Sequence, residues 1–169
     1  MCNDGLFFSR KEALMKLYWL LLFALAPAAF GYVSNLLILT PVGMLIFWLQ
    51  PFLMAAFCLW FGRRCALRGN HFLSTLALTQ WCNLLSIPLY IWQFHFCAEE
   101  ARNLFLCLLA QLPATPLLMP AMRITSLFVD NYWELSATTI VSVLLLGILF
   151  SAGFLWGQRT QQAAAISTE

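Results

Sequence analysis

The 169-residue sequence is 62% hydrophobic and only 9% charged, and its net charge is +2. A water-soluble domain has roughly a quarter of its residues charged, so this chain has too little polar surface to fold in water. The small net charge excludes the electrostatic footprint of a nucleic-acid-binding protein. The length accommodates about four to six membrane spans of about 20 residues each. We therefore expect the lipid bilayer as a partner, and no nucleic acid.

Apolar blocks alternate with short segments that hold all the formal charges. This pattern predicts an all-α, polytopic membrane protein with about five hydrophobic helices, the fourth of them broken by prolines. We expect one transmembrane domain over residues 17–157, between a cytoplasmic segment 1–16 and a polar tail 158–169. The expected spans cover residues 17–33, 42–61, 72–92, 103–122 and 135–156.

The N-terminal region is also typical of a secretory signal, because Arg10, Lys11 and Lys16 precede a short apolar run and a small-residue segment. We expect a retained first helix instead, since apolar residues continue as far as Val33, past the place of cleavage. Pro27 lies within this helix, and it predicts a kink or an interruption because proline lacks a backbone N–H.

The direction of the first three spans follows from the loop 62–71, which contains Arg63, Arg64 and Arg68. Loops rich in Lys and Arg tend to face the cytoplasm. The sequence therefore predicts a multi-pass protein of the cell membrane with this loop and the N-terminus in the cytoplasm. The next loop, with its two glutamates, is then outside.

The fourth apolar block, 103–122, holds Pro113, Pro116 and Pro120, which cannot all lie in one unbroken helix. It is either a kinked full span or a re-entrant hairpin whose backbone is shielded by protein or water. In both cases seven Lys and Arg lie inside and two outside. The charge count therefore leaves the side of the C-terminus open.

No ionisable residue falls within a predicted span, whereas pumps and proton-coupled transporters usually hold one there. Four amide side chains do lie at membrane depth, each of them on a block with a nearby helix interruption. Buried amides in a membrane can hydrogen-bond to neighbouring helices. Where the helix is interrupted nearby, they can instead form part of a substrate site. These candidate positions are Gln50, Gln80, Asn83 and Gln111.

The densest group of titratable side chains lies in the outer loop and comprises His95, Glu99, Glu100 and Arg102. Two carboxylates and a histidine are the groups that general acid–base catalysis requires. The glutamate pair with its arginine partly resembles the glutamate motif of intramembrane CAAX-type proteases. That motif has three residues before the arginine, whereas Ala101 alone intervenes here, and the other histidine, His71, is predicted on the opposite side. We therefore assign no family on this resemblance.

The six cysteines show no metal-ligand spacing, and no phosphate-binding or nucleophile motif is present, so we expect no cofactor, metal or catalytic residue. Gly153 and Gly157 form a GxxxG pair suited to close helix packing, either within the chain or between subunits. The sequence favours a non-catalytic accessory or assembly subunit, or a minor transport component for an uncharged or amphipathic solute. Other membrane subunits or a homo-oligomer are the expected partners. The alternative is a membrane-embedded hydrolase that uses the outer-loop group.

Overall fold

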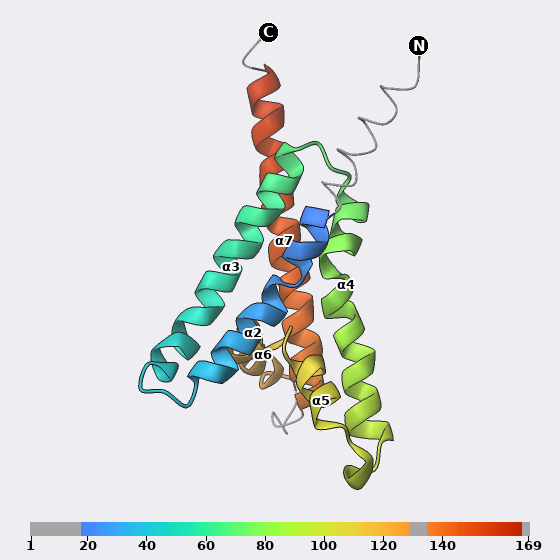
Figure 1. Cartoon of the computed structure of the whole chain (residues 1–169). Coiled ribbons are helices and arrows are strands. Elements are labelled where there is room, and N and C mark those ends of the chain that lie inside the picture. Colours follow the sequence, from blue (N-terminus) through green and yellow to red (C-terminus); the bar gives the residue numbers. More distant parts are fainter. Residues whose placement is uncertain (1–17, 129–134, 167–169) are drawn as a thin grey trace, which may run out of the picture.

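The computed structural model describes residues 18–128 and 135–166, and these residues form helices and short connections without any strand (Figure 1). The α-helices are α2 (Ala26–Leu37), α3 (Gly43–Leu67), α4 (Phe72–Ile91), α5 (Leu104–Gln111), α6 (Leu118–Thr125) and α7 (Leu135–Ile166). Three short helices complete the set: η1 (Trp92–Phe96), a π-helix, and η2 (Glu99–Ala101) and η3 (Thr115–Leu117), both 3-10 helices.

Four helical segments are long and apolar enough to cross a membrane: Tyr18–Leu37, Gly43–Leu67, Phe72–Phe96 and Ser136–Ala164. They contain 20 to 29 residues, and a rise of about 1.5 Å per residue gives each of them the roughly 30 Å needed for a hydrocarbon core. A fifth candidate is α5 together with the segment Thr115–Thr125, which comprises η3 and α6 and is bent by 53° relative to α5. The predicted all-helical architecture with four to five such helices is therefore confirmed.

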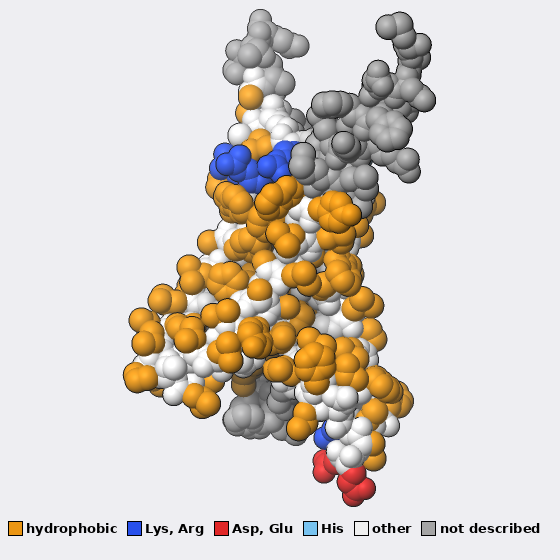
Figure 2. Space-filling view, in the orientation of Figure 1, with side chains coloured by type: hydrophobic (Ala, Val, Ile, Leu, Met, Phe, Trp, Pro, Cys, Tyr) orange, Lys and Arg blue, Asp and Glu red, His pale blue; other side chains and the backbone are white. Residues whose placement is uncertain are grey.

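The surface of the bundle is apolar along most of its length and charged at its two ends (Figure 2). Arg63, Arg64 and Arg68 lie at one end, which we call the cationic end. Glu99 and Glu100 lie at the other, which we call the acidic end. These charges thus flank an apolar band of the kind that contacts lipid, whereas Arg123 of α6 lines a depression on the side of the bundle with residues of α3 and α7.

The first helix is interrupted where Pro27 predicts it. Residues 18–24 are helical, Leu25 forms a turn, and α2 begins at Ala26, so that Pro27 occupies its first turn. A proline is tolerated there because the first backbone N–H groups of a helix have no partner within it. The helix then continues to Leu37, beyond the expected end at residue 33.

The cationic end differs from the expected loop 62–71, because α3 continues through Arg63 and Arg64 to Leu67. Arginine is a good helix former, and Gly62 lies within the helix, where its missing side chain admits the Phe150 backbone of α7. The helix ends at Leu67, and Gly69 follows with a φ of +72°, a left-handed conformation that favours glycine.

Two glycines of α7 bring its backbone against α3. A Cβ on Gly153 would clash with the Leu59 carbonyl oxygen, and one on Gly157 would lie 2.7 Å from the Arg63 carbonyl oxygen. Phe150 and Phe154 fill the adjacent core with Phe61 of α3. The GxxxG pair therefore serves packing within the chain, which is the first of the two uses that the sequence allowed.

The acidic end is closed by a contact between distant parts of the chain. His95 Nε2 lies 2.7 Å from Ser136 Oγ, so the end of η1 and the beginning of α7 lie together. From there α7 runs to the cationic end, where Gln161 Nε2 donates to the Leu67 carbonyl oxygen at 3.0 Å. The segment between Phe96 and Ser136 therefore leaves and rejoins the bundle at the same end.

The fourth block, expected over residues 103–122, is broken as its prolines predict, and it divides into α5, η3 and α6 around Pro113 and Pro116. Both prolines are buried. At this break, a backbone carbonyl group finds a partner from another helix: Ser142 Oγ of α7 donates to the Ala114 carbonyl oxygen at 2.6 Å. Gly31 of α2 packs against the carbonyl of Leu112, where any larger side chain would clash.

Candidate functional site

One face of α4 and η1 carries polar side chains into the centre of the bundle, and we call it the polar stripe. Its residues are 1–4% exposed and follow one another at intervals of three, four or seven positions, which places them on one helix face. The polar stripe consists of Thr75, Thr79, Asn83, Ser86 and Gln93. The bundle thus has a polar interior line inside an apolar exterior.

The hydroxyl groups of the polar stripe bond to their own helix. Thr79 Oγ1 donates to the Thr75 carbonyl oxygen at 2.9 Å, and Ser86 Oγ donates to the Asn83 carbonyl oxygen at 2.6 Å. Ser and Thr in apolar helices commonly satisfy themselves in this way. These hydroxyls therefore need no hydrogen-bond partner from another helix and contribute little to helix association.

The amides are only partly satisfied. Asn83 Nδ2 donates to Gln80 Oε1 at 2.6 Å, one helical turn away, whereas Asn83 Oδ1 and Gln50 Nε2 are buried without a hydrogen-bond partner. Gln50, Gln80 and Asn83 are 2%, 8% and 1% exposed. Three of the four candidate amides are therefore buried, and two of their polar atoms lack a hydrogen-bond partner there.

The fourth candidate, Gln111, lies elsewhere. It is half-buried at the end of α5 and lines a surface depression near Arg102 and Glu99. Its carbonyl oxygen accepts a hydrogen bond from Thr115 Oγ1 at 3.0 Å, which steadies the break between α5 and η3. The structure therefore places Gln111 in the outer loop region, apart from the polar stripe.

Gln93 joins the end of the polar stripe to α5. Its Oε1 accepts from the backbone N–H of Asn103 at 3.1 Å and from Cys107 Sγ at 3.8 Å. Asn103 in turn caps α5, since its side-chain oxygen accepts from the backbone N–H of Phe105 at 3.0 Å. A buried glutamine thus fixes the position where the fourth block begins.

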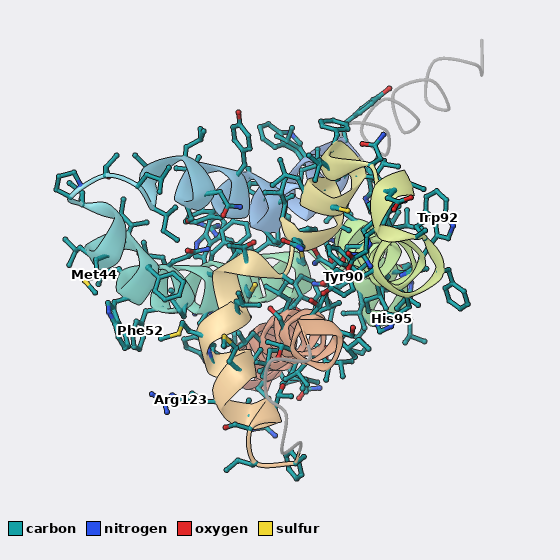
Figure 3. All side chains as sticks on the ribbon, turned by 90° about the horizontal axis from the view of Figure 1, so that it is seen from below. Met44, Phe52, Tyr90, Trp92, His95 and Arg123 are labelled. Carbon is teal, nitrogen blue, oxygen red and sulfur yellow. The ribbon has the colours of Figure 1, made fainter. Side chains whose placement is uncertain are left out.

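The outer-loop group divides into two unconnected parts. His95 pairs with Ser136, which is also a hydrogen-bond partner of the Tyr90 side chain, and Figure 3 shows Tyr90 and His95 beside α7 at the acidic end. Glu99 instead forms an ion pair with Arg102, at 3.6 Å. Glu100 is exposed and makes no hydrogen bond or ion pair with any described residue.

Arg102 is positioned by the backbone and by an aromatic ring more than by its carboxylate partner. Its guanidinium donates to the Phe94 carbonyl oxygen at 3.2 Å and lies 5.6 Å from the centre of the Phe94 ring. The side chain of Glu99 is 88% exposed. Because water screens exposed ion pairs strongly, the Glu99–Arg102 pair adds little to the position of this loop.

A long depression on the outside of the bundle, about 650 Å³ in volume, separates α4 from α7, and we call it the α4/α7 groove. Small residues line part of it, and so does Gln80, which accepts the hydrogen bond from Asn83 of the polar stripe. Its lining residues are Leu73, Leu76, Ala77, Gln80, Leu84, Val143, Leu144, Gly147, Ile148, Ser151, Ala152 and Leu155. Several of the leucines and isoleucines are more than half exposed, as lipid-facing or partner-facing side chains are.

Gly147 distinguishes the α4/α7 groove from the internal helix contacts. A Cβ built on Gly147 would meet nothing within 4 Å, whereas the other described helical glycines each meet backbone atoms. Glycine costs about 1 kcal/mol relative to alanine inside a helix. Among the described helical glycines, Gly147 is thus the one at which the position of a side chain is not occupied by a neighbouring element.

Comparisons with protein families, with curated proteins and with solved structures found no match. Within residues 18–128 and 135–166, no three His, Cys, Asp or Glu side chains come together as a metal site requires. Sequence reasoning missed Gln93, Ser136 and the groove; the periodic polar residues from Thr75 onward were the available signal for Gln93.

Proposed function

We propose that this chain is an integral membrane protein that acts as a non-catalytic subunit, bound through the α4/α7 groove to a transmembrane helix of another protein. The open space at Gly147 carries this proposal. Small residues let helix backbones approach closely in a bilayer, where packing replaces the hydrophobic effect as the driving force. A partner helix bound in the groove would form such close backbone contacts over several successive turns.

The membrane arrangement that goes with this proposal has four crossings. The cationic end faces the cytoplasm by the positive-inside tendency, and both ends of the described chain lie on that side, in the cell membrane. The pair α5 and α6 forms a re-entrant element on the outer side, because the chain leaves and rejoins the bundle there. The contacts of Ala114 and Leu112 supply the shielding that such an element needs.

A second copy of the chain fits the groove less well than a different helix. A two-fold contact would place the same concave surface on both sides of the interface, and two facing depressions leave a void. A single convex helix carrying larger side chains would instead fill the space above Gly147 and Ser151. The hydroxyl of Ser151 donates to the Gly147 carbonyl oxygen at 2.8 Å, so it presents no unsatisfied donor to the partner.

Site-specific photo-cross-linking in cells tests this function. A photoreactive residue at Leu144, in the groove, is expected to cross-link a defined membrane protein, and Gly147→Leu should abolish that product. The control is Ala56→Leu, on an exposed face of α3, which should leave it unchanged. A strictly monomeric particle without any cross-linked partner would contradict the proposal, and a cross-linked homodimer would contradict the choice of partner.

The alternative is a membrane-embedded hydrolase at the acidic end, and the hydrogen bond between His95 and Ser136 is the observation in its favour. A hydroxyl within 2.7 Å of an imidazole is the arrangement of a nucleophile and its base. In that case Ser136→Ala should abolish activity while Glu99→Gln and Glu100→Gln retain it. Loss of activity in the two glutamate variants, in protein that still inserts and accumulates, would instead indicate that His95, Glu99 and Glu100 form the catalytic group.

A further inference from the structure

A second cavity lies at the cationic end, on the side formed by the first helix and α3, and we call it the cationic pocket. Its volume is about 310 Å³. Aromatic and aliphatic side chains line one part, and two arginines and an asparagine line the other. The lining residues are Trp19, Leu20, Phe23, Trp60, Phe61, Arg64, Cys65, Arg68 and Asn70.

The two arginines reach one cavity because of their spacing. Arg64 and Arg68 are four residues apart at the end of α3, which places them on the same face. Gly69 then reverses the chain direction, and the Asn70 backbone N–H donates to the Cys65 carbonyl oxygen at 3.4 Å. This turn brings Asn70 into the lining of the same pocket as the two arginines.

No described carboxylate neutralises these arginines. Glu99 and Glu100 are the acidic residues within the described ranges, and they lie at the opposite end of the bundle (Figure 2). The C-terminal end of α3 contributes a partial negative charge of about one half, which two full positive charges exceed. Counting the described residues alone, the polar end of the pocket thus carries net positive charge.

Arg63 does not belong to this pocket. Its guanidinium lies 4.7 Å from the centre of the Trp156 ring, on the side of α7. Arg64 has only a distant contact with an aromatic ring, 6.0 Å from Trp60, and no hydrogen bond or ion pair holds its guanidinium among the described residues. Its donors are thus available to a ligand.

The apolar part of the pocket runs from the guanidinium groups toward the membrane interior. Phe23 packs on Phe61 with ring centres 4.7 Å apart, and Trp19 stacks on Phe23 at 6.0 Å. These rings form a wall beside the arginines at the depth where headgroups give way to acyl chains. A ligand that fits must therefore be anionic at one end and apolar along the rest.

We propose that the cationic pocket binds an anionic phospholipid, with its phosphate between Arg64 and Arg68 and an acyl chain along Trp19 and Phe23. Arginine matches phosphate oxygens with paired N–H donors. The apolar wall distinguishes this ligand from free phosphate, which would use the arginines alone. The site would hold one lipid at a fixed place on the cytoplasmic leaflet, on a different face from the α4/α7 groove.

Native mass spectrometry of the full chain in detergent tests this binding. Phosphatidylglycerol is expected to form a one-to-one adduct, and phosphatidylcholine with the same acyl chains should bind at least several-fold more weakly. Arg64→Gln and Arg68→Gln should each weaken the phosphatidylglycerol adduct about fivefold, the effect of one basic side chain near an anionic lipid. The conservative Arg68→Lys should retain most of the binding.

The control for general surface charge is Arg159→Gln, which removes an exposed arginine of α7 that does not line the pocket. An equal loss in that variant, or equal binding of both lipids, would overturn the proposal. Trp19→Ala should weaken the lipid adduct without affecting inorganic phosphate. Displacement of the lipid by millimolar inorganic phosphate alone would show a soluble anion site and would also overturn it.

Discussion

His95 Nε2 and Ser136 Oγ lie 2.7 Å apart, although 41 positions separate them in the sequence. This contact sets the connectivity of the whole bundle, because it places the end of η1 beside the beginning of α7. The 39 residues between Phe96 and Ser136 must then start and finish at the acidic end. The four-crossing arrangement proposed above rests on this contact, and it returns the end of α7 to the side of Arg63, Arg64 and Arg68.

Cysteine labelling tests this connectivity. In a variant that lacks the native cysteines, Ser126→Cys should react with a membrane-impermeant reagent added outside the cell. Gln158→Cys should react only after the cytoplasm is opened, because it lies near the cationic end of α7. Reaction of Gln158→Cys from outside would contradict the arrangement.

The buried amide pair makes a prediction about stability. Asn83→Ala removes the donor to Gln80 Oε1 and leaves that oxygen buried. Hydrogen bonds between side chains in membrane proteins contribute about 0.6 kcal/mol on average and up to about 2, so we expect a loss in this range. Unfolding in a mixed detergent titration measures it. Leu84→Ala, at a residue 54% exposed on the same helix, is the control and should lose less.

Part of this interior was predictable from the sequence. The amides Gln50, Gln80 and Asn83 stood out as polar residues within apolar blocks, and they are buried. The hydroxyl residues of the polar stripe did not stand out, because Ser and Thr are common in transmembrane helices and their bonds are local. Their spacing of three and four positions from Thr75 to Ser86 was the physical signal, since only one helix face recurs at that interval.

The contacts between distant elements were not predictable in the same way. The pairing of His95 with Ser136 depends on where α7 begins after a 39-residue connection. The internal use of Gly153 and Gly157 depends on which helix lies next to α7. The extension of α3 through Arg63 and Arg64 depends on a packing contact at Gly62, which overrides the tendency of a glycine to end a helix. Local sequence contains none of this information.

The outer loop makes a prediction about two neighbouring charges. Glu99→Gln should change the free energy of unfolding by less than about 0.5 kcal/mol, because the Glu99 carboxylate is largely exposed and screened by water. Arg102→Ala should cost about 1 to 2 kcal/mol, since it removes a hydrogen bond to the Phe94 carbonyl and a stacked contact with its ring. Thermal unfolding in detergent compares them. Equal effects would show that the ion pair itself holds the loop.

Two glycines on the same helix provide the sharpest comparison of internal and external packing. Gly153→Ala should destabilise the isolated chain by about 1 to 3 kcal/mol, the usual cost of overpacking, because its methyl group would overlap the Leu59 backbone. Gly147→Ala should be neutral or should stabilise it by up to about 1 kcal/mol, since alanine favours the helix and meets no neighbour. Thermal unfolding of the purified monomer measures both. A destabilised Gly147→Ala monomer would mean that α4 closes over this position, and the α4/α7 groove would then have no room for a partner helix.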